Sequence, residues 1–106
     1  MVGFEKVSGG VFGRDYVVYI LEVPSRHLTV RRRYSDFSWL RETFTALHPG
    51  LPIPPISKKK NRVRYDDKYL YKKMYILEKF INKVLQIEEL ATDEVFERFL
   101  VLKDSK

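Results

Sequence analysis

The apolar residues of this chain change their spacing at about residue 35, and this change restricts the fold to a sheet followed by helices. Segments 4–7, 16–23 and 28–34 are rich in β-branched and aromatic residues and are joined by short turns, as in an antiparallel meander. Beyond residue 36 the apolar residues recur at helical spacing instead. We therefore predict an α+β domain in which a three-stranded antiparallel β-sheet packs against a helical subdomain.

Start and stop signals outline three helices after the sheet. Ser35 is the expected N-cap of the first helix, Asp36 lies in its first turn, and His48-Pro49-Gly50 ends it. A long helix is expected from about residue 67 to residue 86. Its apolar stripe consists of Leu70, Leu77, Phe80, Ile81 and Val84. A short final helix is expected to follow Thr92 as its N-cap.

A proline-rich segment separates the first two helices. Pro52, Pro54 and Pro55 lie within four positions, which excludes a helix or a central strand and favours the polyproline II conformation. The fold is therefore predicted to include a polyproline loop. A basic loop, residues 57–65, follows it, and the stiff lead-in would position the lysines of that loop at low entropic cost.

Composition points to one basic domain with an anionic partner. The 106 residues are predicted to form a single domain, 1–106, cut from a longer protein. The formal net charge is +6, which suits nucleic acid, an acidic protein or an anionic membrane surface. No apolar run approaches the length of a membrane span, so a membrane role would be peripheral. The absence of cysteine excludes disulfides and is consistent with the cytoplasm.

The sequence offers no convincing catalytic or metal centre. The two histidines, His27 and His48, stand beside turn signals and are predicted to be exposed. The acidic pairs at residues 66–67 and 88–89 suit helix starts, where they complement the helix dipole. Motifs typical of zinc proteases and nucleotide-binding loops do not occur. We therefore predict that the chain is not an enzyme and has no catalytic residue, cofactor or metal.

Three consecutive arginines end the third predicted strand. Alternation directs Arg32 to one face of the sheet and both Arg31 and Arg33 to the other. At least one arginine must then face the helices or lie where the sheet ends. A buried guanidinium requires a carboxylate or a bound anion. Two interpretations remain open here, an internal salt bridge, for example with Asp36, and a phosphate site, which the planar guanidinium suits.

Further basic residues occur on two other elements. The cluster at residues 58–64 (KKKNRVR) is either a solvated charge run or a binding loop. Lys73 lies three residues after Leu70 and four before Leu77, which places it in or beside the apolar stripe of the long helix. Its ammonium group either extends to the edge of the helix or reaches into a polar pocket.

These residues resemble the PX (phox homology) domain of the sorting nexin type. The resemblance rests on residues 30–40 (VRRRYSDFSWL), 53–56 (IPPI), 77–81 (LEKFI) and 96–100 (FERFL), in that order. It covers nearly the whole chain. It implies a three-stranded sheet against a helical subdomain, with a lipid pocket between the sheet, the proline-rich loop and the long helix. Family members typically bind phosphatidylinositol 3-phosphate on endosomes.

The resemblance also assigns roles to individual residues. Arg33 would pair with the 3-phosphate, Tyr34 would stack under the inositol ring, and Lys59 would meet the 1-phosphate, with Lys58 or Lys60 able to substitute. Lys73 stands where the family usually has an arginine that holds the ring hydroxyls. Because lysine lacks the guanidinium fork, it would either hold the ring hydroxyls more weakly than arginine does or tolerate an additional phosphate.

The remaining residues of the basic loop receive auxiliary roles. Arg62 and Arg64 are candidate contacts to an anionic membrane, and Val63 and Tyr65 are candidate membrane contacts. The expected function is a peripheral phosphoinositide-binding module for endosomal protein sorting. The alternative is a protein-interaction module with weak or relaxed lipid specificity. Nucleic acid is disfavoured as a partner, because the tyrosines at positions 16, 19, 69, 71 and 75 are expected to serve the core.

Overall fold

A computed structural model describes residues 3–11, 13, 15–56 and 66–101 of the chain. Strands β1 (Gly3–Val7), β2 (Tyr16–Val23) and β3 (Leu28–Arg33) form an antiparallel sheet in the order β1-β2-β3. In its register, Glu5 of β1 and Arg33 of β3 both pair with Val18 of β2. The predicted meander is confirmed.

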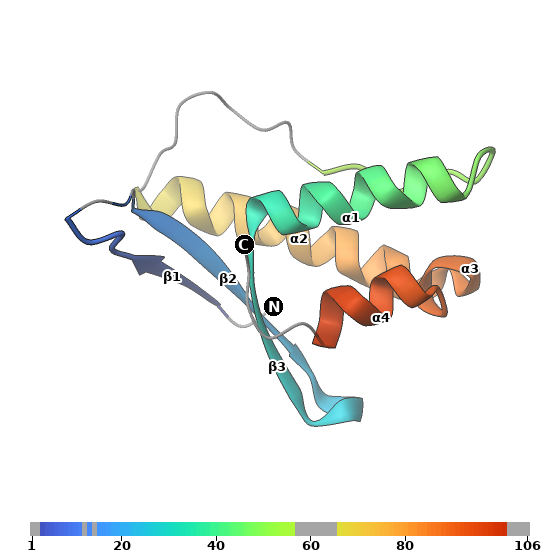
Figure 1. The fold of residues 1–106 in the computed structure, drawn as a ribbon, viewed down its shortest axis with the longest axis horizontal. Helices are drawn as coiled ribbons and strands as arrows, with labels where there is room; N and C mark the ends of the chain where they lie inside the picture. The colour runs from blue at the N-terminus through green and yellow to red at the C-terminus, as the bar shows by residue number, and fades with distance from the viewer. Residues whose placement is uncertain (1–2, 12, 14, 57–65, 102–106) are drawn as a thin grey trace.

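The helices pack together beside the sheet (Figure 1). They are α1 (Tyr34–Leu47), α2 (Asp67–Gln86), α3 (Glu88–Ala91) and α4 (Glu94–Val101). A short 3-10 turn, η1 (Pro24–Arg26), connects β2 to β3. The predicted bounds of the long helix are confirmed. The bounds of α3 were not predicted, because four residues are too few to show an apolar period, but its start agrees with the acidic pair at 88–89 that was assigned to a helix start. The described residues include no helix that is long and apolar enough to cross a membrane.

Strand β3 passes directly into α1, which corrects the predicted cap. The N-cap of α1 is Arg33, not Ser35, and the helix begins at Tyr34. Asp36 decides the boundary, because its carboxylate accepts a hydrogen bond from the Arg33 N–H at 2.8 Å and so fixes the first turn. The strand ends at Arg33, and the alternation that would send Arg33 and Tyr34 to opposite faces therefore ends there too.

The start of α4 also differs from the prediction. The Asp93 carboxylate accepts a hydrogen bond from the Val95 N–H at 2.8 Å and provides the cap that was assigned to Thr92. Thr92 instead ends α3, where its hydroxyl donates to the Glu88 carbonyl at 2.8 Å. The predicted N-cap was therefore one residue too early, because Thr92 is the C-cap of the short helix α3.

One apolar core joins the sheet to the helices. Its largest fully buried side chains are Phe37, Phe44, Phe80, Leu40, Leu70, Leu77, Leu90 and Val84. All five residues of the predicted stripe on α2 are buried. Phe37 of α1 meets Phe99 of α4 edge to face, with ring centroids 5.1 Å apart. The core thus holds α1, α2 and α4 in the fixed arrangement on which the candidate site depends.

The proline-rich segment packs against this core. Residues 51–56 form neither helix nor strand, as predicted, and Pro54 is buried. The Arg41 Nε of α1 donates a hydrogen bond to the Pro54 carbonyl at 2.9 Å. This contact ties the segment to α1. The polyproline II conformation itself stays a prediction.

Candidate functional site

The β3–α1 junction presents two of the predicted binding residues side by side. Arg33 is half-buried, and its guanidinium carbon lies 4.5 Å from the ring centroid of Tyr16, the first residue of β2. This is a cation–π contact, which holds a guanidinium in position while leaving its edge able to donate hydrogen bonds. Tyr34, also half-buried, begins α1. The fold thus places the guanidinium group of Arg33 at one corner, beside the ring of Tyr16 and one residue before Tyr34.

Lys73 of α2 reaches the same corner. Its side chain is only 6% exposed, and its Nζ lies 4.2 Å from the ring centroid of Tyr34 and 5.6 Å from that of Tyr69. The prediction that Lys73 lies in or beside the apolar stripe is therefore confirmed. Tyr69 precedes Lys73 by one helical turn, so both project from the same side of α2. We call Arg33, Tyr34, Tyr69 and Lys73 the basic-aromatic corner.

A buried tyrosine of the sheet lies next to this corner. Tyr19 of β2 is 3% exposed. Burial raises the pKa of its hydroxyl above the usual range, and the nearby hydroxyls of Tyr69 and Tyr34 add to the increase. Tyr19 therefore remains a neutral phenol there, one that can donate or accept a hydrogen bond.

Sequence reasoning missed the roles of two aromatic residues. Tyr16 and Tyr69 were assigned to the core alone, yet Tyr16 holds Arg33 and Tyr69 flanks Lys73. Tyr19 lies in the core, as predicted. The spacing of Tyr69 and Lys73, one turn apart, was a usable signal. Tyr71 and Tyr75, also assigned to the core, are 58% and 57% exposed. That assignment was wrong.

The other two arginines of the triplet have structural partners. Arg32 is 3% exposed, and it donates from Nε to the Phe99 carbonyl of α4 at 2.8 Å and from NH1 to the Arg31 carbonyl at 2.6 Å. One arginine therefore faces the helices, as predicted. Arg31 forms an ion pair with Glu5 of β1. The contacts of this buried arginine include two backbone carbonyls, which the sequence did not indicate.

The basic loop connects the proline-rich segment to the start of α2. The loop follows the segment that Arg41 ties to α1, and α2 begins directly after it. Lys58, Lys59, Lys60, Arg62, Val63, Arg64 and Tyr65 lie outside the described residues. Their roles stay predictions.

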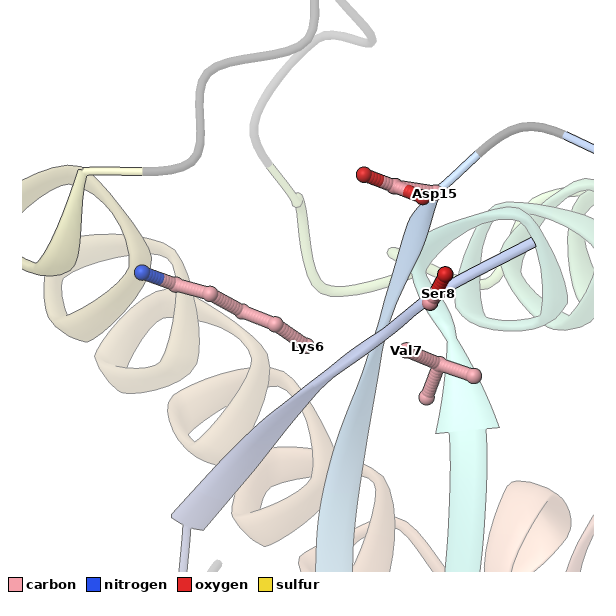
Figure 2. A pocket seen from close by; sticks show the side chains of 4 residues that line it. All are labelled: Lys6, Val7, Ser8 and Asp15. Atoms are coloured by element: carbon pink, nitrogen blue, oxygen red, sulfur yellow. The ribbon is translucent and has the colours of Figure 1, made fainter. Parts of the chain in front are cut away.

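A separate hollow lies between the β1–β2 end of the sheet and the start of α2. Its volume is about 330 Å³, and Lys6, Val7, Ser8 and Asp15 line it (Figure 2). The Lys6 side chain extends toward α2, where its Nζ lies 2.9 Å from Oδ1 of Asp67. No residue of the basic-aromatic corner is among the lining residues. The hollow is thus separate from the corner, and Lys6, the lysine that lines it, already pairs with the carboxylate of Asp67.

The two histidines differ from each other. His27 is exposed, as predicted, and adopts a left-handed conformation at the end of η1. His48 is not an exposed turn residue, because its Nε2 lies 2.6 Å from the Asp93 carboxylate and its side chain is 22% exposed. This contact links the end of α1 to the start of α4. No cluster of metal-ligating residues occurs in the part of the chain that the structure describes.

Comparison with known proteins identifies the family. The PX domain model matches residues 21–103. The chain belongs to the PX domain family. It is 37% identical to sorting nexin-41 of Neurospora crassa over 92% of the chain, and 37% identical to sorting nexin-7 of Homo sapiens over 74%. The X-ray structure of a designed CISK-PX domain superposes with a TM-score of 0.79 at 31% identity, covering 96% of each chain.

Family membership supports a phosphoinositide-binding module of membrane trafficking rather than an enzyme. A PX domain is a membrane-binding unit, and the solved PX structure shares both the sheet and the helices of this chain. The chain spans only 16% of sorting nexin-41 and 21% of sorting nexin-7.

Proposed function

We propose that this PX domain binds phosphatidylinositol 3-phosphate through the basic-aromatic corner and recruits its parent protein to endosomal membranes for protein sorting. The observation that supports this most is the position of Lys73, whose buried ammonium lies against the ring of Tyr34 while Arg33 directly precedes that ring. A cation of α2 thus lies against the aromatic residue that follows the last arginine of β3, an arrangement that suits a ring carrying phosphates.

Each residue of the corner offers a distinct interaction. Arg33 presents a planar fork that suits bidentate contact with the 3-phosphate. Tyr34 offers a flat apolar face to the inositol ring. Lys73 supplies a point charge and up to three donors for ring hydroxyls. Lys59, outside the described residues, would meet the 1-phosphate that links the ring to the lipid.

A specific pocket is needed because nonspecific attraction is too weak. Each lysine or arginine near an anionic leaflet contributes about 1 kcal/mol. The five basic residues of the loop would supply about 5 kcal/mol, which corresponds to a sub-millimolar dissociation constant. The corner would provide the rest of the affinity and all of the headgroup selectivity. This domain is proposed to be one part of a longer protein, and membrane contacts made by the other parts would add to the affinity and to the selectivity.

The test is vesicle sedimentation with each mono- and bis-phosphorylated phosphoinositide at near-physiological salt. The parent domain is expected to pellet with phosphatidylinositol 3-phosphate vesicles, and Arg33→Ala is expected to remain in the supernatant while keeping its circular dichroism spectrum. Arg31→Ala is the matched control, because it removes a neighbouring arginine that pairs with Glu5 on the surface. Equal pelleting of Arg33→Ala and the parent would reject the corner as the headgroup site.

The replacement of the usual arginine by Lys73 motivates a second candidate function. A lysine makes a less directional contact with ring hydroxyls, and a headgroup with an additional phosphate would supply a charge partner for it. Equal pelleting with all phosphorylated lipids would favour relaxed specificity. Pelleting with none would favour a protein-interaction role for the domain.

A further inference from the structure

The outward face of α2 carries lysines and tyrosines that neither the core nor the lipid corner uses. These residues, which we call the α2 stripe, are Lys68, Tyr71, Lys72, Tyr75, Lys79 and Lys83. All six are exposed, and they follow one side of a straight helix over about 22 Å. Exposed tyrosines on this scale are typical of contact surfaces rather than of inert protein surface.

The lysines of the stripe keep their charges available. Among the described residues, no ion pair engages Lys68, Lys72, Lys79 or Lys83. The acidic residue at the start of the helix, Asp67, is already paired with Lys6 of β1. Four lysines that form no ion pair among the described residues therefore project from one helical face, which favours an anionic partner.

The tyrosines of the stripe are held in place from the side. Tyr71 meets Phe4 of β1 edge to face, with centroids 5.0 Å apart. Tyr75 lies under the Lys79 ammonium, which is 5.1 Å from its ring centroid. These contacts fix the two rings without burying them, so they can receive a partner at low entropic cost. A fixed tyrosine beside a lysine suits a partner that combines apolar and acidic side chains.

The stripe and the lipid corner lie on different sides of α2. Lys79 and Lys73 are six residues apart, which separates them by about 120° around the helix axis. Lys73 faces Tyr34 of α1, whereas Lys79 faces solvent. A headgroup held at the corner would therefore leave the stripe accessible, and a flat bilayer would not face both surfaces equally.

We propose that the α2 stripe binds an acidic segment of a partner protein, with the carboxylates of that segment meeting the lysines and its apolar side chains packing on Tyr71 and Tyr75. A second copy of this chain fits poorly, because a symmetric contact through the stripe would bring like charges together. This proposal does not depend on the proposed lipid site.

The test is fluorescence anisotropy with a labelled peptide of about a dozen residues in which glutamate and leucine alternate. The parent domain is expected to bind it, and added salt should weaken the binding. The paired variants Tyr71→Ala/Tyr75→Ala and Lys79→Glu/Lys83→Glu should each weaken it by about tenfold. Trp39→Ala and Arg98→Glu are matched controls, since they change an exposed aromatic residue of α1 and an exposed arginine of α4 and should bind as the parent does.

The outcomes separate this proposal from the lipid site. Both stripe variants should pellet with phosphatidylinositol 3-phosphate vesicles as the parent does, whereas Arg33→Ala should still bind the peptide. Failure of the parent to bind the peptide, or equal binding by the stripe variants and the controls, would overturn the proposal. It would also be overturned if the stripe variants changed only the binding of phosphatidylserine vesicles or of oligouridylate.

Discussion

Two buried cations of the described chain, Arg32 and Lys73, lie against different kinds of group. Arg32 donates directional hydrogen bonds to carbonyl oxygens, one of them in the last turn of α4, where helix carbonyls have no intrahelical partner. Lys73 lies against the rings of Tyr34 and Tyr69, which attract a cation without fixing the direction of its N–H groups. The carbonyl contacts hold β3 to α4, whereas the ring contacts hold the Lys73 ammonium at the corner that we propose as the headgroup site.

The largest expected effect tests the stabilising role of Arg32. Arg32→Ala removes the donors to two carbonyls and leaves a cavity between β3 and α4, so the free energy of unfolding should fall by about 3 kcal/mol. Urea denaturation measures it. Arg31→Ala, which removes an exposed ion pair with Glu5, should change it by less than about 0.5 kcal/mol. Equal losses for the two variants would show that burial and carbonyl contacts do not distinguish these arginines.

The next effect tests the binding role of Lys73. Lys73→Met keeps an unbranched stem of similar size but removes the charge, and the affinity for phosphatidylinositol 3-phosphate vesicles should fall by about tenfold or more. Its urea midpoint should stay close to that of the parent, because an apolar side chain tolerates this buried site.

Lys73→Arg should sharpen the same comparison. The guanidinium fork can make two parallel hydrogen bonds to the ring hydroxyls, so selectivity for the 3-phosphate over bisphosphorylated lipids should increase. Vesicle sedimentation across the phosphoinositide panel measures this change. A large loss of stability in Lys73→Met with unchanged lipid affinity would assign Lys73 the same structural role as Arg32.

The smallest effect concerns the contact between α1 and α4, at Asp93. Partial burial alone would raise the pKa of Asp93, but hydrogen bonds from the Val95 N–H and from His48, together with the charge of His48, outweigh it and lower that pKa. A lowered folded-state pKa stabilises the fold above the unfolded value and loses this effect as the pH falls through the folded value.

Asp93→Asn isolates this charge, because asparagine is also a good N-cap. At neutral pH the variant should be less stable than the parent by about 1 kcal/mol. This difference should shrink as the pH falls below about 4, the ordinary value for aspartate. Denaturation at several pH values measures it. A difference that grows on acidification would contradict the lowered pKa, and lipid binding at neutral pH should be unchanged.

The sequence predicted the elements better than their junctions. Periodicity placed β2 and α2 correctly, because each has a regular apolar face that the core requires. Caps depend on which polar side chain reaches which N–H. The prediction of Ser35 and Thr92 as N-caps was therefore wrong, since the carboxylates of Asp36 and Asp93 accept the hydrogen bonds from backbone N–H groups at these two helix starts.

The site was predictable only as far as local spacing allowed. The position of Lys73 beside the apolar stripe followed from its distance to Leu70 and Leu77. The contact between Arg32 and Phe99 could not be predicted from local spacing, because the two residues are 67 positions apart. Only tertiary packing brings the Phe99 carbonyl to β3. The exposure of Tyr71 and Tyr75 could have been predicted, because helical spacing places them about 120° and about 160° from Leu77 around the helix axis, away from the apolar stripe.

The most direct test of the lipid site is a titration of the ¹⁵N-labelled domain with soluble inositol 1,3-bisphosphate, followed by the chemical shifts of backbone amides. The account predicts that the largest shifts occur at Arg33, Tyr34 and Lys73, while Lys79 and the residues around His48 change little. Largest shifts around Lys6, Ser8 and Asp15, or no shifts at all, would contradict the assignment of the basic-aromatic corner as the headgroup site.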